Sequence, residues 1–439
     1  MEINRYQALE EKSLISPQKS GSPVILAKGK YDQETGEQTE PEVQPINSQS
    51  SDERIVAREM KLFQPFRVSG LELKNRVVLT PVVMRLGSED GKVTGEVIEH
   101  YLRIARGGVG WLIIEDVVVT PRKSPFVLRI SGEEFIEGMR RLTDTIHAET
   151  DAKIGVQLGH FLKLARSGYR QKVEDLTMDE IREIYEQHVA AAKRIKQCGF
   201  DSLEWDAESW MTLSQFLSRN NKRKDEYGGT QQNRERLLME IYDASRDILG
   251  SDYILGMRIN GDDLCLGGTT LLQSTKTACN LARRGINYIS VSCGGQWEDT
   301  TKPSKKIPLA LTAYNTTYSG LRCWPRAWDP DGANVYLAEG IRKALRKEGY
   351  QTPVITAGKI PTAEFAEEIL QEGKADLIGL ARPLLCDPDW VRKYLEDRPE
   401  DIVRCTYCNY CAGLKDATTC ALWPRGSIHP PDPFLPRSK

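Results

Sequence analysis

Residues 353–382 have the sequence PVITAGKIPTAEFAEEILQEGKADLIGLAR, which contains one complete strand–helix–strand unit. The apolar runs Pro353–Thr356 and Asp376–Leu380 are short and largely apolar on both faces, which predicts strands buried in a parallel sheet. Between them, Thr362–Glu372 carries apolar residues at helical spacing and predicts an amphipathic helix. Two parallel strands joined by a helix are the repeating unit of α/β domains.

The same alternation continues toward the amino terminus. Further strands are predicted at Val77–Thr80, Trp111–Glu115, Ile154–Leu158, Ser202–Trp205, Ile254–Ile259 and Tyr288–Ser292. Further helices are predicted at Gly95–Arg106, Glu133–Ala148, Met178–Gln197, Gln231–Leu249, Leu271–Arg284 and Gly332–Lys347. Eight such strands over about 320 residues predict an α/β fold of the (β/α)8 TIM barrel type. A doubly wound sheet is the alternative, but it usually has fewer strands per domain.

Composition divides the chain into four segments. Residues 1–58 are rich in Glu, Gln, Ser and Pro and predict an acidic, flexible extension, or alternatively an arm that wraps a partner subunit. Residues 59–400 form the predicted barrel, 401–424 contain four cysteines, and 425–439 form a Pro-rich tail.

Charge and hydropathy exclude several classes of protein. With 60 Lys+Arg against 62 Asp+Glu, the net charge of -2 gives no global attraction for nucleic acid or anionic membranes. The mean hydropathy of -0.46, with no apolar run near the ~20 residues that a spanning helix needs, predicts no membrane span. The opening MEINRYQALEEK lacks a secretory pattern, so we expect a cytoplasmic protein. Its ten cysteines are then not expected to form a disulfide framework.

The last two strands are followed by small and basic residues. Glycines in Thr356–Lys359 (TAGK) and Gly379–Pro383 (GLARP) let backbone N–H groups approach an anion, and Arg382 adds a bidentate cation. This corner commonly binds phosphate in barrels. Simple turns are the alternative.

Two other strand ends carry polar groups. Gln157 offers an amide that can both donate and accept hydrogen bonds, and Arg258 places a permanent cation in the barrel mouth. A buried cation needs a partner, which is either a cofactor or a carboxylate such as Asp206.

Seven motifs occur in an order that carries a resemblance. They are LFQPFRVSGLELKNRVVLTPVV (Leu62–Val83), RGGVGWLIIE (Arg106–Glu115), GVQLGH (Gly155–His160), SQFLSRNNKRKDEYGGTQQNRER (Ser214–Arg236), GMRIN (Gly256–Asn260), ITAGKI (Ile355–Ile360) and GKADLIGLARPLLCDPDW (Gly373–Trp390). Over residues 61 to 424, roughly, the chain resembles the old yellow enzyme family of FMN-dependent barrel oxidoreductases.

The resemblance implies roles for particular residues. Gln157 would bond the flavin pyrimidine ring, and Arg258 would lie beside its nitrogen and carbonyl, where a cation favours the anionic reduced flavin. The residues implied along one flavin face are Pro81 and Val82, and those implied to hold the FMN phosphate are Gly358 and Arg382. Further cofactor-binding candidates beside them are Val83, Ala357, Gly379 and Ala381.

The four cysteines of residues 401–424 have the spacing of a metal centre. Cys405-x2-Cys408-x2-Cys411-x8-Cys420 places four thiolates within sixteen residues, enough to complete a [4Fe–4S] cluster. Zinc is the alternative. The position after the eighth strand resembles the trimethylamine dehydrogenase and 2,4-dienoyl-CoA reductase branch, in which a nucleotide-binding domain follows the cluster. The other six cysteines are expected to be packing residues.

The chain departs from that branch in length. Nineteen residues follow Cys420, and no G-x-G-x-x-G lies in a strand–helix context, so we expect the nucleotide-binding domain to be missing. Electrons would then come from NAD(P)H at the FMN itself or through a separate redox protein, either a flavoprotein or an NADH-oxidising subunit.

A second departure concerns the substrate site. Relatives carry H-x-A-H-G-Y where this chain has DAESWM, so Asp206 and Ser209 replace the usual His pair or His/Asn pair. His160 is the histidine left at a strand end. These three residues are the candidate catalytic groups, since a desolvated Asp206 can serve as acid or base. The alternatives are a structural His160 and an Asp206 that pairs with Arg258 or Lys163.

The segment Gly294–Asp331 is a long loop with aromatic residues at Trp297, Tyr314, Tyr318, Trp324 and Trp328. It is expected either to cap the flavin against a planar substrate or to form an oligomer contact.

Together these features predict a cytoplasmic oxidoreductase that uses FMN and a [4Fe–4S] cluster. Hydride would move between the flavin and a small organic substrate, such as an enoate or enoyl-CoA alkene, while the cluster relays single electrons to a redox partner. One alternative is an electron-transfer subunit of a larger homo- or hetero-oligomeric complex. Another is an enzyme resembling an amine dehydrogenase.

Overall fold

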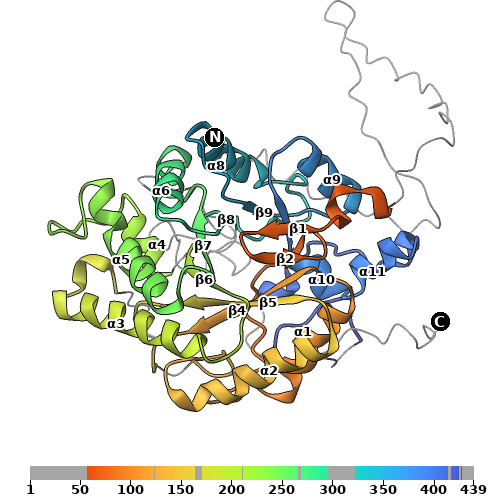
Figure 1. Ribbon diagram of the computed structural model, residues 1–439, viewed down its shortest axis with the longest axis horizontal. Helices are drawn as coiled ribbons and strands as arrows, with labels where there is room; N and C mark the ends of the chain where they lie inside the picture. The colour runs from red at the N-terminus through yellow and green to blue at the C-terminus, as the bar shows by residue number, and fades with distance from the viewer. Residues whose placement is uncertain are drawn as a thin grey trace, which may run out of the picture. The chain divides into compact units, whose positions relative to one another are not determined.

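The predicted barrel is present in the computed structural model, which describes residues 57–122, 124–163, 171–209, 211–264, 268–294, 322–413, 417–424 and 427 (Figure 1). Its strands are β3 (Val77–Leu79), β4 (Trp111–Val118), β5 (Lys153–Gly159), β6 (Ser202–Ala207), β7 (Ile254–Asn260), β8 (Tyr288–Ser292), β9 (Val354–Ala357) and β10 (Leu377–Leu380). All neighbours pair in parallel, and β10 pairs with β3 to close the barrel. The predicted extension and tail lie outside the described residues, except for Ala57, Arg58 and Ser427.

The predicted helices surround the barrel and begin at capping residues. They are α1 (Gly95–Arg106), α2 (Ile136–Glu149), α3 (Met178–Ile195), α5 (Gln231–Leu249), α6 (Leu271–Arg283), α8 (Val335–Lys347) and α9 (Ala363–Gln371). The side chains of Thr94, Thr177, Thr230 and Thr362 each accept a hydrogen bond from a backbone N–H in the first helical turn, which fixes where four of these helices start. The short helices α4 (Thr212–Leu217), α10 (Arg382–Cys386) and α11 (Trp390–Leu395) are not among those that the sequence predicts.

Alternation along the strands produces two hydrophobic layers. Trp205 of β6 points outward, where its Nε1 donates to Ser245 Oγ of α5 at 3.1 Å. Residues of opposite parity point inward, and the rings of Trp111 and Tyr288 meet edge to face inside the barrel at 4.7 Å. Glu204 and Asp206, on either side of Trp205, are therefore directed into the barrel.

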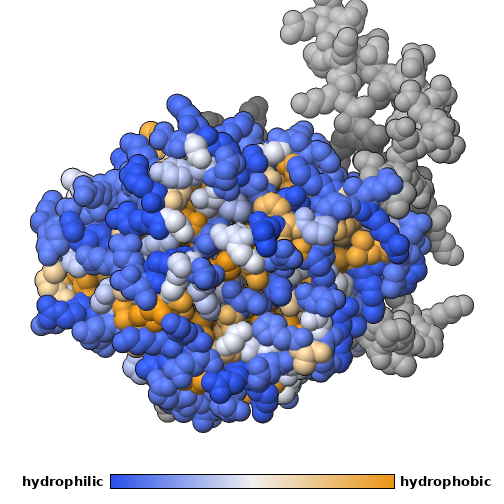
Figure 2. Space-filling model, viewed as in Figure 1, coloured by the Kyte–Doolittle hydropathy of each residue, from blue (hydrophilic) through white to orange (hydrophobic). Residues whose placement is uncertain are grey.

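An antiparallel hairpin closes the amino end of the barrel. Its strands are β1 (Phe66–Val68) and β2 (Leu71–Leu73), and their buried side chains pack against Trp111, Tyr288 and other residues near the starts of the barrel strands. In Figure 1 the hairpin lies across the barrel, and Figure 2 shows this face as mostly hydrophilic with small hydrophobic areas. Ligands therefore have access to the barrel interior only at the carboxyl end of its strands.

Among the described residues, no helix is both long enough and apolar enough to cross a lipid bilayer.

Gly256 of β7 makes room for the Tyr288 ring on which this interior packing depends. A Cβ at this position would lie 2.1 Å from Tyr288 Cζ, so Gly256→Ala must displace a fully buried ring. We expect the free energy of unfolding in urea to fall by about 3 kcal/mol. Gly70→Ala is the control, since no atom lies within 4 Å of its Cβ, and we expect a change below about 0.5 kcal/mol. Equal effects of the two substitutions would contradict the prediction.

Candidate functional site

An irregularity in β4 decides which acidic side chain enters the barrel mouth. The register of β4 against β5 shifts between Ile114 and Asp116, as in a β-bulge, so that Asp116 pairs with Gln157. Glu115 instead contacts the Tyr101 hydroxyl of α1 at 3.4 Å and accepts a hydrogen bond from Met84 N–H at 3.1 Å. Strict alternation would have directed Glu115 inward, and the bulge substitutes Asp116.

Acidic side chains from β4, β6 and the residues after β6 surround Arg258 of β7. They are Asp116, Glu204, Asp206 and Glu208. Burial raises the pKa of Asp116 and that of Glu204 to about 7 each, against the attraction of Arg258. Burial and the neighbouring Glu208 and Asp116 carboxylates raise the pKa of Asp206 well above its usual range. At neutral pH this cluster therefore holds protons that isolated carboxyl groups would have lost.

Several buried polar atoms in this cluster have no hydrogen-bond partner in the described part of the chain. They include Nε and Nη1 of Arg258, both carboxylate oxygens of Asp116 and Oδ2 of Asp206. Asp206 Oδ1 accepts from Glu208 N–H at 3.0 Å, so Asp206 does not form the predicted pair with Arg258. Unpaired buried donors are costly, and the guanidinium N–H groups fit a ligand rich in acceptors, such as a flavin pyrimidine ring.

Gln157 also belongs to this cluster. Its Nε2 donates to Glu204 Oε1 at 2.7 Å, and both residues lie below the mouth on adjacent strands. The structure thus brings the predicted pyrimidine ligands Gln157 and Arg258 into one layer of the barrel, on either side of β6.

Ser209 follows β6 in a strained conformation. Its φ is +49°, in the left-handed region that non-glycine residues seldom adopt, and Asn260 Oδ1 accepts its N–H at 3.2 Å. Its hydroxyl donates to Glu208, which also accepts from Ser292 Oγ at 2.6 Å. Backbone strain of this kind often occurs at functional sites. The contact with Glu208 places Ser209 beside the acidic cluster.

His160 has different surroundings. Its Nδ1 hydrogen-bonds with Thr212 Oγ1 at 2.7 Å, and its ring lies 5.7 Å from that of His188. Burial, His188 and Arg122 lower the pKa of His160 well below its usual value, so the ring is neutral. These contacts are typical of a structural histidine. Lys163 pairs with Glu180 at 3.4 Å and not with Asp206.

The predicted phosphate corner is formed by three neighbouring strands. β10 pairs with both β9 and β3, so the residues that follow these strands lie together. Partial exposure is shared by the predicted phosphate ligand Gly358, the predicted flavin-face residues Pro81 and Val82, and the cofactor candidates Val83, Ala357 and Ala381, whereas Gly379 is buried. The φ of Gly358 is +119°, which only glycine adopts readily, so its backbone can turn toward a ligand.

Arg382 lies in this corner but is already engaged. Its Nη1 donates to Pro325 O at 2.6 Å and to Asn409 Oδ1, and its guanidinium lies 4.8 Å from the centre of the Tyr407 ring. Only 7% of the residue is exposed. Arg382 therefore joins the end of β10 to the cysteine segment.

The predicted metal ligands line one small hollow together with Arg382; they are Cys405, Cys408, Cys411 and Cys420. Tyr407 and Asn409, each between two cysteines, have φ of +54° and +58°, which bends the segment into tight turns. Backbone N–H groups of Tyr407 and Leu422 donate to the sulfurs of Cys405 and Cys420 at 3.4 and 3.5 Å. Such donors stabilise thiolates.

This donor set fits a four-iron cluster, in which each iron takes one thiolate. Among the described residues, no group of three or more His, Cys, Asp or Glu side chains is arranged to hold a metal ion, so the cluster and its alternative, zinc, both rest on the number and spacing of the thiols.

The end of the aromatic loop reaches this mouth. Residues 295–321, with Trp297, Tyr314 and Tyr318, lie outside the described part of the chain. Cys323 Sγ is 3.9 Å from Ser209 Oγ, and the Trp324 ring lies 5.5 Å from the Arg382 guanidinium. Trp328 is 76% exposed.

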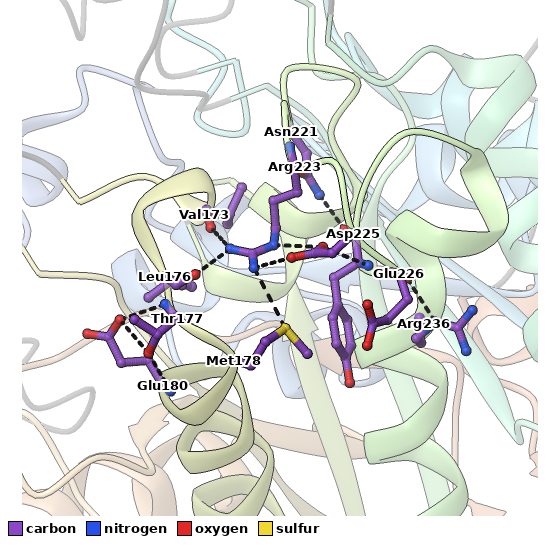
Figure 3. A network of polar contacts seen from close by, with 11 residues as sticks. Val173, Leu176, Thr177, Met178, Glu180, Asn221, Arg223, Asp225, Glu226 and Arg236 are labelled. Atoms are coloured by element: carbon purple, nitrogen blue, oxygen red, sulfur yellow. Dashed lines mark hydrogen bonds and ion pairs between the residues drawn. The ribbon is translucent and has the colours of Figure 1, made fainter.

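A buried arginine fixes the loop that leads from α4 into α5 (Figure 3). Arg223 donates to the carbonyls of Val173 and Leu176 at 2.6 and 2.7 Å and pairs with Asp225. It thereby ties the segment before α3 to the segment before α5. The contacts explain the charged motif at 218–229 as structural.

The profile of the NADH:flavin oxidoreductase / NADH oxidase family matches residues 61–309 and 325–401. The chain belongs to this family.

Relatives within this flavin oxidoreductase family differ in length. An NADPH dehydrogenase of Geobacillus sp. is 32% identical over 349 residues, covering 76% of this chain and 93% of that protein. A metal reductase of Desulforamulus reducens is 35% identical over 367 residues, and an NADH oxidase of Thermoanaerobacter brockii is 32% identical over 374. Those alignments cover 79% and 80% of this chain but 50% and 53% of the relatives, so the chain spans about half their length.

Solved structures show the same architecture. A 2-naphthoyl-CoA reductase with 2-naphthoyl-CoA has a TM-score of 0.68 and 25% identity, over 80% of this chain and 54% of that one. Morphinone reductase with tetrahydroNAD has a TM-score of 0.59 and 22% identity, over 77% and 91%. The second likeness concerns the fold.

Sequence reasoning missed several residues of this mouth. Asp116 and Glu208 join the acidic cluster, whereas Asp206 was the carboxylate singled out from the sequence. The sequence does contain one indication, the adjacent acidic residues Glu115 and Asp116 at the end of an otherwise apolar run. A β-bulge at this point would direct Asp116 into the barrel in place of Glu115.

Proposed function

We propose that this chain is an FMN- and [4Fe–4S]-dependent oxidoreductase that moves hydride between the flavin and an organic substrate. The cluster would relay single electrons to or from a redox partner protein. The observation that carries the proposal is Arg382, which lies both in the predicted phosphate corner and in the wall of the four-cysteine hollow. Two sites that share one residue suit cofactors that exchange electrons.

The chain's own groups would divide the remaining work. The flavin, when bound, supplies the hydride chemistry. Arg258 offers two unpartnered N–H donors to hold it, and Asp206 holds a proton beside the mouth. Reduction of an activated alkene requires a donor at the substrate carbonyl and a proton for the second carbon, and a protonated carboxyl group supplies either. The likeness to a 2-naphthoyl-CoA reductase supports an acyl-CoA substrate.

Replacing Asp206 tests its role as the proton-holding group. We expect Asp206→Asn to slow substrate reduction by about 100-fold, the usual contribution of a general acid. In the wild type the rate should fall as pH rises and Asp206 deprotonates, and this limb should vanish in the variant. Asp116→Asn removes a like charge that raises the Asp206 pKa, so its limb should move to lower pH. Stopped-flow reoxidation of reduced flavin at several pH values measures both, and an unchanged profile in Asp206→Asn would contradict the assignment.

The acidic cluster favours a second candidate substrate class. Four carboxyl groups against one guanidinium at the mouth would attract a cationic amine, whose oxidation the flavin can also carry out. A protonated amine would be held by Asp116 and Glu208, and its affinity would rise with pH as Asp116, whose pKa is raised to about 7, ionises.

One experiment tests the function. The full chain is purified without oxygen and analysed for FMN, iron and acid-labile sulfide, then mixed with NAD(P)H, enones, enoyl thioesters and amines. We expect one FMN and about four irons per chain, with turnover of at least one alkene class. Turnover of amines alone would favour the second candidate. Cofactors without independent turnover would favour an electron-transfer subunit, and zinc in place of iron would refute the proposal.

A further inference from the structure

Two of the contacts between the four-cysteine segment and the barrel lie beside residues expected to bind the flavin. One contact is made by Asn409, between Cys408 and Cys411, and the other by Thr418, two residues before Cys420. Neither residue has a counterpart in the sequence-based assignments.

Asn409 positions Arg382. Its Oδ1 accepts a hydrogen bond from Arg382 Nη1, and its Nδ2 donates to Trp324 O at 2.8 Å. The left-handed φ of +58° at Asn409 comes from the tight turn between two cysteines, and asparagine tolerates that conformation. The direction of the guanidinium therefore depends on the turn that the cysteines form.

Thr418 fixes the segment after β3. Its N–H donates to Met84 O and its hydroxyl to Val83 O, both at 2.8 Å. The residue is 4% exposed, and Met84 N–H in turn donates to the buried Glu115. The backbone of Val83, a cofactor-binding candidate that directly follows Val82 of the expected flavin face, is thus held from the cysteine side.

The hydrophobic core orders the two ends of the segment, where Ile402 and Trp423 are buried, and less holds the residues between them. Within the described part of 401–424, regular structure is limited to the one-turn 3-10 helix Tyr410–Gly413 and the end of another at Pro399–Asp401. A short segment without a core of its own gains order from metal ligation, because ligation contributes folding free energy. Loss of the ligands would release Asn409 and Thr418 together.

We propose that Asn409 and Thr418 are positioning residues that make the affinity for FMN depend on assembly of the cluster. The inference rests on the proposed function, since it requires both cofactors. With the cluster present, Arg382 and the Val83 backbone are held in place before the flavin arrives. Without the cluster, flavin binding must also order the segment. The apparent affinity for FMN is then the intrinsic affinity multiplied by the fraction of chains in which the segment is ordered.

The test measures FMN dissociation constants by flavin fluorescence, in the full chain with the cluster and after its anaerobic removal by a chelator. We expect removal to weaken FMN binding about tenfold. Asn409→Ala should weaken it about tenfold in the loaded protein with iron content unchanged, and Thr418→Val about threefold. In the cluster-free chain neither substitution should have a further effect. Thr419→Val is the matched control, since this threonine of the same segment is not in the wall of the four-cysteine hollow and makes no hydrogen bond within the described residues.

The outcomes separate the inference from the function on which it rests. If the wild-type chain, purified without oxygen, holds no iron or binds no FMN, the proposed function is overturned. If it binds both and FMN affinity is the same with and without the cluster, the inference alone is overturned. Equal weakening by Asn409→Ala in loaded and cluster-free protein would also overturn it, because the effect would then be independent of the cluster. Near-ultraviolet circular dichroism confirms that each variant remains folded.

Discussion

Arg258→Gln is expected to weaken FMN binding by about 100-fold, or about 2.7 kcal/mol. Arg258 is half-buried at the strand end, with Nε and Nη1 lacking partners among the described residues, so its donors are available to a ligand and not committed to the fold. Its loss also removes the cation that opposes the raised pKa of Asp116 and Glu204, so both carboxyl groups should retain protons to higher pH. Titration of the cluster-loaded protein with FMN measures the first effect.

Two further variants define what this result means. Arg258→Lys keeps the charge but loses the planar fork of donors, so it should recover only part of the affinity. Arg223→Gln removes another buried arginine, whose partners are carbonyls and Asp225 far along the chain from Arg258. It should lower the free energy of unfolding and leave FMN affinity per folded chain unchanged. Unchanged FMN affinity in Arg258→Gln would remove Arg258 from the flavin site.

Cys405→Ser should reduce iron from about four atoms per chain to less than one, since a cubane needs all four thiolates. With FMN in excess, we expect reduction of the flavin by NAD(P)H to continue within about twofold, while transfer onward to a one-electron acceptor falls at least about 100-fold. The split follows because hydride chemistry belongs to the flavin and single-electron transfer to the cluster. Stopped-flow traces with a one-electron dye distinguish the two steps.

A matched substitution guards against loss of the fold. Cys198→Ser changes a fully buried cysteine whose Sγ lies 3.2 Å from Arg194 O, outside the four-cysteine segment. It should retain iron and both electron-transfer steps. Retention of iron in Cys405→Ser, or equal loss in Cys198→Ser, would contradict the assignment of the cluster ligands.

The barrel could be predicted because each of its strands leaves a local mark. Runs such as those at 111–115 and 254–259 are buried on both faces, and the structure places them in β4 and β7 as expected. The hairpin at 66–73 escaped prediction because three-residue strands carry too little periodicity. Its apolar residues become meaningful only once a barrel floor exists to receive them.

The site was less predictable than the fold, because it depends on which residues of a strand point inward and on contacts between residues far apart in the sequence. The bulge in β4 exchanges Glu115 for Asp116 at the mouth, and alternation alone points to the wrong one. Asn409 and Thr418 meet partners far away in the sequence, so no local pattern distinguishes them. Asp206 and Ser209, by contrast, were singled out because they stand where relatives carry H-x-A-H-G-Y, and their catalytic role stays a prediction.

The hairpin of β1 and β2 also determines how ligands reach the barrel interior. Because one end of the barrel is sealed, everything exchanged with the solvent must share the opposite rim. On that rim the cysteine segment occupies the sector of β10 and β3, while the proton-holding acids occupy the sector of β4 to β7. The cysteine segment, where the proposed cluster would bind, is thus separate on this rim from the acidic cluster, where a substrate would bind. A partner protein docked at the cysteine segment would leave the acidic cluster open to a small molecule.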